Sequence, residues 1–220
     1  MLPTSCRVVV VPDARTPAGV SPVDSIPLAD ALRAPWFEHS MDAHITQYGK
    51  ANGEACPRLK VCDMQQAIED GVELHVALLD LDCPGHTPWS DGARGEDAIE
   101  ALEEIIYRAS KHQLPVGGYT SRAGLRLVLP LSPAVPLDKA TGVLDALYHQ
   151  VRQAVGDCTD VGVEWDDNAN AQWSRLFRAP DVTRDGQTLR SYCVLPTGSY
   201  NPRAPHRQGE DRVPDGSCCG

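Results

Sequence analysis

The stretch HVALLDLD (His75–Asp82) decides the fold, because an unbroken apolar run ends there in two carboxylates one residue apart. The run Val76–Leu79 predicts a strand buried on both faces, since four consecutive apolar residues leave no polar face. Residues i and i+2 of a strand point to the same side, so Asp80 and Asp82 should project together from its end. Such a pair suits a divalent metal ion that also holds phosphate oxygens. The alternative is a strand that simply ends in polar residues.

The segments around this strand predict an α+β (mixed α/β) fold. Strands and helices alternate along the chain, and the two longest helices each carry an apolar stripe at helical spacing. In chain order, the predicted elements are a strand at 7–11, the HVALLDLD strand, a helix at 97–112, two strands within 119–131 around a bend at 123–124, a helix starting at the capping residue Asp138 and ending at Gly156, and short strands at 161–165 and 191–195.

Length and composition narrow the class of protein. The 220 residues form one large domain or two small ones, and 42% hydrophobic residues suffice for a sizeable core. No apolar run approaches the length that spans a bilayer, and the first residues lack the pattern of a secretion signal, so we expect a cytoplasmic protein that binds no membrane. The eight cysteines are scattered without a CxxC pair, which argues against a zinc ribbon and suits reduced thiols.

Charge is distributed unevenly along the chain. The formal net charge of −10 argues against a surface that binds nucleic acid everywhere, but it does not exclude a local basic groove. Acidic residues cluster at 96–104 and 157–167, whereas arginines gather at 175–190 and 203–212. The positions of the arginines are therefore more informative than the total charge.

Three stretches carry residues suited to chemistry. The first is Asp80-Leu81-Asp82, and the second is YTSRAGLR (Tyr119–Arg126), a bend with hydroxyls and two arginines. The third is the pair Asp166-Asp167, followed by SRLFRAP (174–180) and RDG (184–186). In this order they resemble the catalytic core of the archaeo-eukaryotic primase superfamily, the primase-polymerases. That family has a DxD or DxE pair at a strand end, a second motif on a hairpin, and a third acid before an R-x-F-R-x-P segment, which RLFRAP matches.

The resemblance covers roughly residues 50–195 and implies an overall architecture. It implies an RRM-like catalytic core with a central, mostly antiparallel sheet flanked by helices. Residues 1–49 would then form an N-terminal subdomain packed on this core. Residues 196–220 are rich in glycine, proline and charge, and they are expected to form a flexible tail.

The resemblance also implies template-directed, metal-dependent nucleotidyl transfer, either extending a primer or starting one. Asp80, Asp82 and Asp167 would hold two Mg²⁺ or Mn²⁺ ions about 4 Å apart, with Asp166 as the alternative to Asp167. One ion would activate the primer 3′-hydroxyl, and the other would neutralise the departing pyrophosphate. Single-stranded DNA template, primer and nucleoside triphosphates are the implied partners, together with helicase or accessory replication domains.

A set of hydroxyl and arginine side chains would bind the incoming nucleotide. Arg175 and Arg178 could serve either the triphosphate or the template backbone, and the alternative for both is a surface ion pair with a nearby acid. Arg126 stands where the family usually has histidine, and arginine can contact a triphosphate bidentately but cannot act as a neutral imidazole. The expected nucleotide-binding residues are Ser121, Arg122, Arg126, Arg175, Arg178 and Arg184.

Two other functions compete with this one. Nucleotide-sugar glycosyltransferases also use DxD to hold a metal and a diphosphate, but they do not predict the RLFRAP segment after a second acid pair. A non-catalytic DNA-binding replication module would tolerate Arg126 in place of histidine, although loss of the acids would then be expected.

Overall fold

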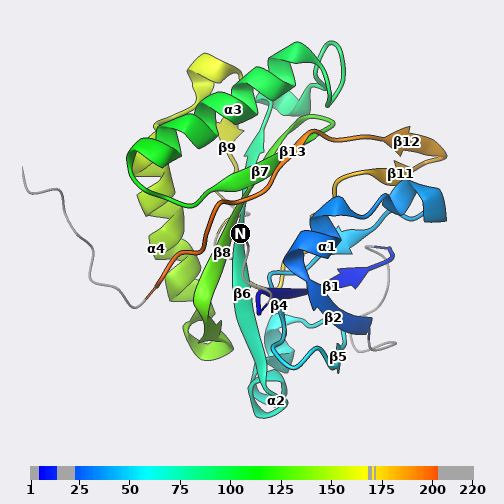
Figure 1. The fold of residues 1–220 in the computed structure, drawn as a ribbon, viewed down its shortest axis with the longest axis vertical. Helices are drawn as coiled ribbons and strands as arrows, with labels where there is room; N and C mark the ends of the chain where they lie inside the picture. The colour runs from blue at the N-terminus through cyan, green and yellow to red at the C-terminus, as the bar shows by residue number, and fades with distance from the viewer. Residues whose placement is uncertain (1–4, 14–22, 168–169, 171, 203–220) are drawn as a thin grey trace, which may run out of the picture.

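The predicted buried strand lies at the centre of the molecule (Figure 1). The computed structural model of the protein describes residues 5–13, 23–167, 170 and 172–202. The central strand, β6 (Val72–Asp82), pairs with β8 along most of its length and with β4 and β9 on its other edge. All pairs in this six-stranded sheet are antiparallel, which confirms the predicted α+β class with a central antiparallel sheet. Its other strands are β4 (Tyr48–Lys50), β7 (Gly117–Ser121), β8 (Gly124–Pro136), β9 (Glu164–Trp165) and β13 (Cys193–Val194).

Two long helices, α3 (Glu96–Lys111) and α4 (Leu137–Val155), pack on one face of this sheet (Figure 1). Both were predicted from their apolar stripes. The first turn of α4 differs from the prediction, because Pro136 takes the N-cap position and Asp138 lies inside the helix. The shorter helical elements are α1 (Leu28–Arg33), α2 (Met64–Glu69) and the 3₁₀ turns η1 (Trp36–His39), η2 (Val61–Asp63), η3 (Pro84–His86) and η4 (Thr159–Val161).

A second, five-stranded antiparallel sheet is assembled from distant parts of the chain. Its strand order is β10-β3-β1-β2-β5, so a strand from the arginine-rich segment pairs with one from the first fifty residues. A separate hairpin, β11–β12, follows that segment. The strands are β1 (Arg7–Val11), β2 (Val23–Pro27), β3 (His44–Ile45), β5 (Ala55–Cys56), β10 (Phe177–Arg178), β11 (Val182–Arg184) and β12 (Gln187–Leu189).

The central strand separates two apolar cores. Ala77, Leu79 and Leu81 pack with α3 and α4, whereas Val76 and Leu78 pack with β1, β3 and α1. Burial on both faces was predicted from the apolar run, and it is confirmed. Because residues alternate along a strand, Asp80 and Asp82 follow Val76 and Leu78 on the face that looks toward the five-stranded sheet.

A bulge in β6 sets which residues face which core. The register with β8 shifts between Leu74 and Val76, and the N–H groups of His75 and Val76 both donate to the carbonyl of Gln47. Leu74 accordingly packs on the helix side, whereas Val76 packs on the opposite side. The bulge thus changes the side-chain phase of the strand once, before the two aspartates.

The predicted division at residue 49 stays a prediction. Strand β4 crosses that boundary and joins the six-stranded sheet, while β10 joins the sheet built mostly from the first 56 residues. Of the predicted tail, residues 203–220 lie outside the described part of the chain. Within the described residues, no helix combines the length and apolar character needed to cross a membrane.

Candidate functional site

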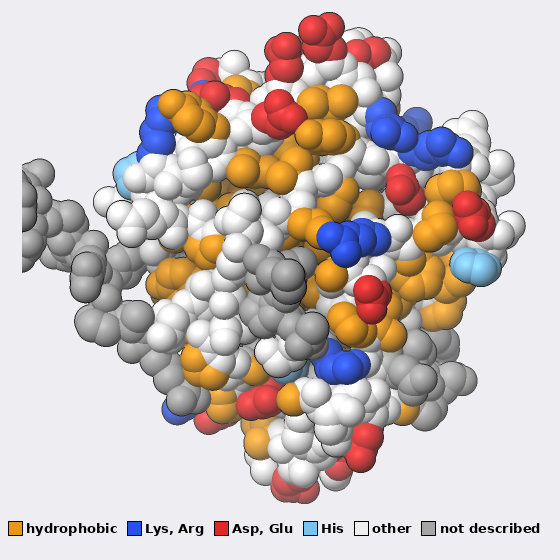
Figure 2. Space-filling view, viewed as in Figure 1, with side chains coloured by type: hydrophobic (Ala, Val, Ile, Leu, Met, Phe, Trp, Pro, Cys, Tyr) orange, Lys and Arg blue, Asp and Glu red, His pale blue; other side chains and the backbone are white. Residues whose placement is uncertain are grey.

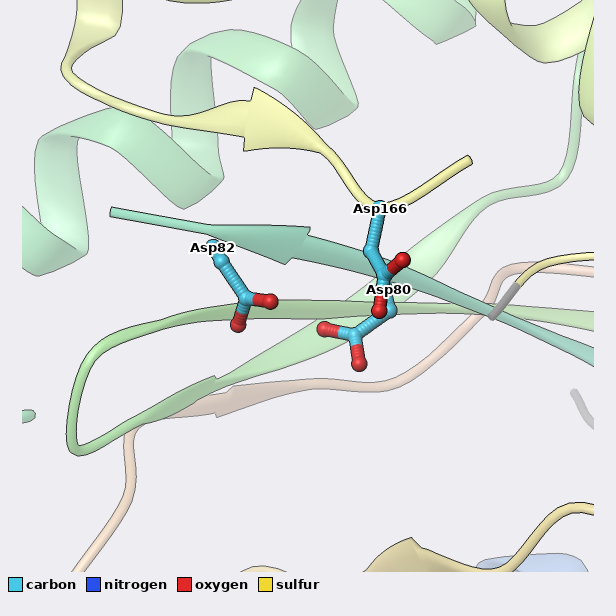
Figure 3. A group of neighbouring side chains, drawn as sticks. All are labelled: Asp80, Asp82 and Asp166. Carbon is cyan, nitrogen blue, oxygen red and sulfur yellow. The ribbon is translucent and has the colours of Figure 1, made fainter. Parts of the chain in front are cut away.

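Three carboxylates meet at the end of β6. Asp80, Asp82 and Asp166 each offer an oxygen, and these oxygens all lie within 4.8 Å of one another (Figure 3). Asp80 is buried, with 1% of its surface exposed, whereas Asp82 and Asp166 are half-buried. Oxygen-rich groups of this kind can hold a divalent cation. The pairing of Asp80 with Asp82 follows from their strand positions, as predicted from the sequence.

Asp166 reaches the cluster because β9 pairs with the end of β6. Its N–H donates to the Asp80 carbonyl at 3.1 Å, which continues the β9–β6 ladder by one residue. The buried side chain of Asn170 ties the same segments together. Its Oδ1 accepts the Asp80 N–H at 2.6 Å, and its Nδ2 donates to the Asp166 carbonyl at 2.8 Å. Asn170 is a positioning residue that was not predicted from the sequence.

The structure does not bring Asp167 to the cluster. Its carboxylate instead accepts the Tyr148 hydroxyl and, at 2.8 Å, Nη1 of Arg152, and its side chain is 66% exposed. Period-two alternation explains the difference, because Asp167 shares the side of Trp165, which packs against Tyr148 on α4. This alternation was available in the sequence. Between the two acids considered there, the geometry selects Asp166 rather than Asp167.

Two arginines contact the carboxylates directly. Arg126 lies opposite Asp80 across β6 and β8, and its Nη1 contacts Asp80 Oδ1 and lies 3.8 Å from Asp82 Oδ1. Nη2 of Arg175 lies 3.5 Å from Asp80 Oδ2 and 3.4 Å from Asp166 Oδ2. Opposite charges facing each other across paired strands stabilise a sheet. Both arginines therefore neutralise charge that would otherwise repel within the cluster.

Asp80 retains the capacity to bind a cation. Its Oδ1 is buried and is paired with Nη1 of Arg126, which also donates to the Leu125 carbonyl at 3.0 Å. Burial raises the pKa of Asp80 to about 6, while the guanidinium of Arg126 opposes this rise. The three carboxylates carry more negative charge than the two arginines neutralise, and their oxygens lie within 4.8 Å of one another, so the residues present fit a divalent metal ion.

A cavity of about 620 Å³ opens beside the acids and is rich in arginine. Asp82 and Arg126 form part of its wall, and the β7–β8 bend and the chain from β10 to Ser191 form most of the rest. Its volume lies within the range of small-molecule sites. On the face drawn in Figure 2, basic side chains gather near β11 and β12, whereas acidic ones lie over α3. The arginines in the wall are Arg122, Arg126, Arg178, Arg184 and Arg190.

Five of the six predicted nucleotide-binding residues line this cavity. Ser121, Arg122 and Arg126 come from the β7–β8 hairpin, and Arg178 and Arg184 come from β10 and β11. Arg175 is not among its lining residues and instead contacts the acids. The role of these residues in binding nucleotide stays a prediction.

Arg178 forms an ion pair, which was the alternative considered for it from the sequence, and Arg184 forms one as well. Nε of Arg178 lies 2.6 Å from Asp42 Oδ1, and Nε of Arg184 lies 3.4 Å from Asp185 Oδ2. Both nevertheless line the cavity. Arg190 belongs to the same arginine cluster but was not predicted, because no motif distinguishes it from its neighbours.

A larger hollow of about 720 Å³ lies against α3, and its chemistry is different. Its described wall carries acids and aromatic side chains but neither lysine nor arginine. Phosphate groups would be repelled there. An anionic ligand is therefore expected in the smaller, arginine-lined cavity. The acids around the hollow are Asp97, Glu100, Glu103, Glu104 and Asp160.

Comparison with known proteins shows a weak likeness to a solved structure. No protein-family model matches the chain, and no curated protein sequence matches it. Among solved structures, the chain is similar to the polymerase domain of ligase D from Mycobacterium tuberculosis in complex with DNA, with 16% identity and a TM-score of 0.40. The match covers 82% of this chain and 65% of that one, so the chain spans about two thirds of that structure's length. The functional assignment therefore rests on the residues of the site.

Proposed function

We propose that the chain is a divalent-metal-dependent nucleotidyltransferase that uses nucleoside triphosphates, and that it acts as a DNA primase or polymerase. The observation that carries this proposal is the position of three carboxylates at the edge of an arginine-lined cavity. Carboxylates suit Mg²⁺ or Mn²⁺, and arginines suit a triphosphate. A nucleoside triphosphate bound together with a divalent ion requires both features within one site.

The acidic residues would bind the metal, and the basic residues would bind the phosphates. Asp80, Asp82 and Asp166 would hold the metal, which supplies neutralisation of the phosphates and activation of an attacking hydroxyl when bound. Arg122 and Arg126 on the β7–β8 hairpin would bind the phosphates from one side of the cavity. Arg178, Arg184 and Arg190 would bind them from the other side.

Two cavity residues are suited to place the nucleotide. Ser121 would donate a hydrogen bond from the end of β7. Tyr119 is buried in the cavity wall, and its hydroxyl donates to the Arg178 carbonyl at 2.7 Å. The ring is therefore fixed, and it links the hairpin to the β10 side of the wall. A triphosphate would then meet arginines whose backbones are already tied together.

A primer-extension and priming assay with Mg²⁺ or Mn²⁺ tests the proposal. The informative variant is Asp80→Asn/Asp82→Asn, and Asp167→Asn is the matched control because it removes an acid that lies outside the cluster. We expect metal-dependent nucleotide incorporation by the wild type and the control, and its loss in the double variant.

Each other outcome of this assay points elsewhere. Incorporation that survives the double substitution would reject the site. Transfer of sugar from a nucleotide-sugar donor would support the glycosyltransferase alternative. Binding of DNA without any incorporation would support a non-catalytic replication module.

A further inference from the structure

The carboxylate cluster already contains two organic cations. Arg126 lies between Asp80 and Asp82, and Arg175 lies between Asp80 and Asp166. Two of the three gaps between the acids are thus occupied by guanidinium nitrogens. These two arginines limit both the space and the negative charge that the cluster offers to metal ions.

Charge balance limits the number of ions. Three carboxylates and two guanidiniums leave one net negative charge when all five groups are ionised. One divalent ion would bring the group to one positive charge, whereas a second would bring it to three. Charges a few ångströms apart at a partly buried site repel strongly, so the second ion would bind far more weakly.

The distances between the carboxylate oxygens also favour a single metal ion. Oxygens bound to one Mg²⁺ ion lie at most about 4 Å apart, given bonds of about 2 Å. The three carboxylate oxygens, which lie within 4.8 Å of one another, need only a small closure to hold one ion. Two ions would lie about 4 Å apart, and that separation would require the space between Asp80 and Asp82 that Nη1 of Arg126 occupies.

Arg126 is held in this place by its backbone and side chain. It faces Asp80 across the strand pair, and its Nη1 also donates to the Leu125 carbonyl. Its side chain is only 17% exposed. The same side chain lines the cavity, so it can neutralise a triphosphate and the acids at once.

We propose that the Arg126 guanidinium occupies the second cation position of the cluster, so that the nucleotide-free protein takes a single divalent metal ion. This inference rests on the proposed function, since it concerns the same site. It replaces the two-ion arrangement expected from the sequence with one metal ion and one fixed arginine.

Counting bound Mn²⁺ on the full chain tests the inference. Free Mn²⁺ is measured by electron paramagnetic resonance during titration, without nucleotide and without reference to activity. We expect one Mn²⁺ per wild-type chain. Arg126→Gln should bind two, with the first bound at least about tenfold more tightly because a neighbouring positive charge is gone. Arg184→Gln, which removes an arginine of the same cavity that pairs with Asp185, should still bind one.

The outcomes separate cleanly. Two Mn²⁺ ions on the wild type would overturn the inference, as would one ion on a folded Arg126→Gln variant. If that variant fails to fold, the wild-type count decides between one ion and two, and Arg126→Lys, which keeps the charge, should retain one. Nucleotide incorporation with two wild-type ions would reject this inference but leave the proposed function standing. One ion bound to the wild type without nucleotide incorporation would support this inference but reject the proposed function.

Discussion

The neighbouring acids Asp166 and Asp167 differ in what they contact. Asp166 faces Asp80 and Asp82, whereas Asp167 binds Tyr148 and Arg152 on α4. Asp166→Asn should therefore weaken Mn²⁺ binding by about tenfold or more, since even outer partners of a metal commonly contribute that much. Asp167→Asn should leave Mn²⁺ affinity nearly unchanged and cost at most about 1 kcal/mol of stability, because its ion pair is exposed. Calorimetric titration with Mn²⁺ measures the affinity of both variants. A larger loss of affinity for Asp167→Asn than for Asp166→Asn would contradict the assignment.

Asp80 should make the metal-free protein less stable as the pH rises. Its pKa is about 6 in the folded chain because of burial, against about 4 when unfolded, so the folded state binds more protons between these values. The free energy of unfolding should thus fall between about pH 4 and 6, and the ionisation of Asp80 should change it little above pH 6. Asp80→Asn removes the penalty, and the variant should be more stable than the wild type at pH 8 by on the order of 3 kcal/mol.

Urea unfolding in the presence of a chelator measures this effect. Asp82→Asn serves as the comparison, because it removes the same charge from a side chain that is 20% exposed. A stability gain for Asp80→Asn that persists unchanged at pH 4 would contradict the burial argument.

The residues of the site were only partly predictable. Asp80 and Asp82 could be paired from the strand period alone, because both lie on one continuous element. Choosing Asp166 over Asp167 required knowing which side of β9 faces α4, and Trp165 carried that signal. Asn170 could not be found, since its role depends on two segments 90 positions apart in the chain.

At the scale of elements, the β7–β8 hairpin packs very closely against β6. A Cβ built at Gly124 would lie 2.1 Å from the Leu81 carbonyl oxygen, and this oxygen belongs to the backbone of the central strand. Gly124→Ala should therefore destabilise the protein by several kcal/mol, because β6 and β8 must separate to relieve the clash. Thermal unfolding followed by circular dichroism would measure the loss.

A glycine in α4 provides the matched control. A Cβ at Gly142 would meet nothing within 4 Å, and the residue lies inside a helix, so Gly142→Ala should stabilise the fold by about 0.5–1 kcal/mol. Similar effects of the two substitutions would show that the hairpin contact is not important.

The long elements were predictable, and the short strands were not. Helices α3 and α4 carry apolar stripes over four or more turns, and β6 has an unbroken apolar run, so each is visible in a local window. Strands β3 and β10 have two residues each, and they form through pairing with distant segments, β10 with β3 and β3 also with β1. Such pairs leave no periodic signal, which is why the five-stranded sheet was not foreseen.

At the scale of the whole molecule, an acidic chain contains an arginine-lined cavity. The net charge is −10, yet five arginines line the cavity against one aspartate. Triphosphate binding should weaken as salt rises from 10 to 150 mM, because the screening length falls from about 30 to about 8 Å. Duplex DNA should bind weakly at physiological salt. Titration with a fluorescent nucleotide would measure the first effect, and affinity that is insensitive to salt would place the nucleotide elsewhere.

The bulge at His75 lets one strand serve two purposes. Before it, Val72 and Leu74 anchor β6 against the helices; after it, the even-numbered positions turn toward the opposite side and end in the acids. Without that extra residue, one of two changes would follow. Val72 and Leu74 would no longer pack against the helices, or the carboxylates of Asp80 and Asp82 would face α3 and α4 and lie buried away from solvent. A deletion there would thus be expected to convert a ligand site into buried, mutually repelling charge, although no functional side chain had been altered.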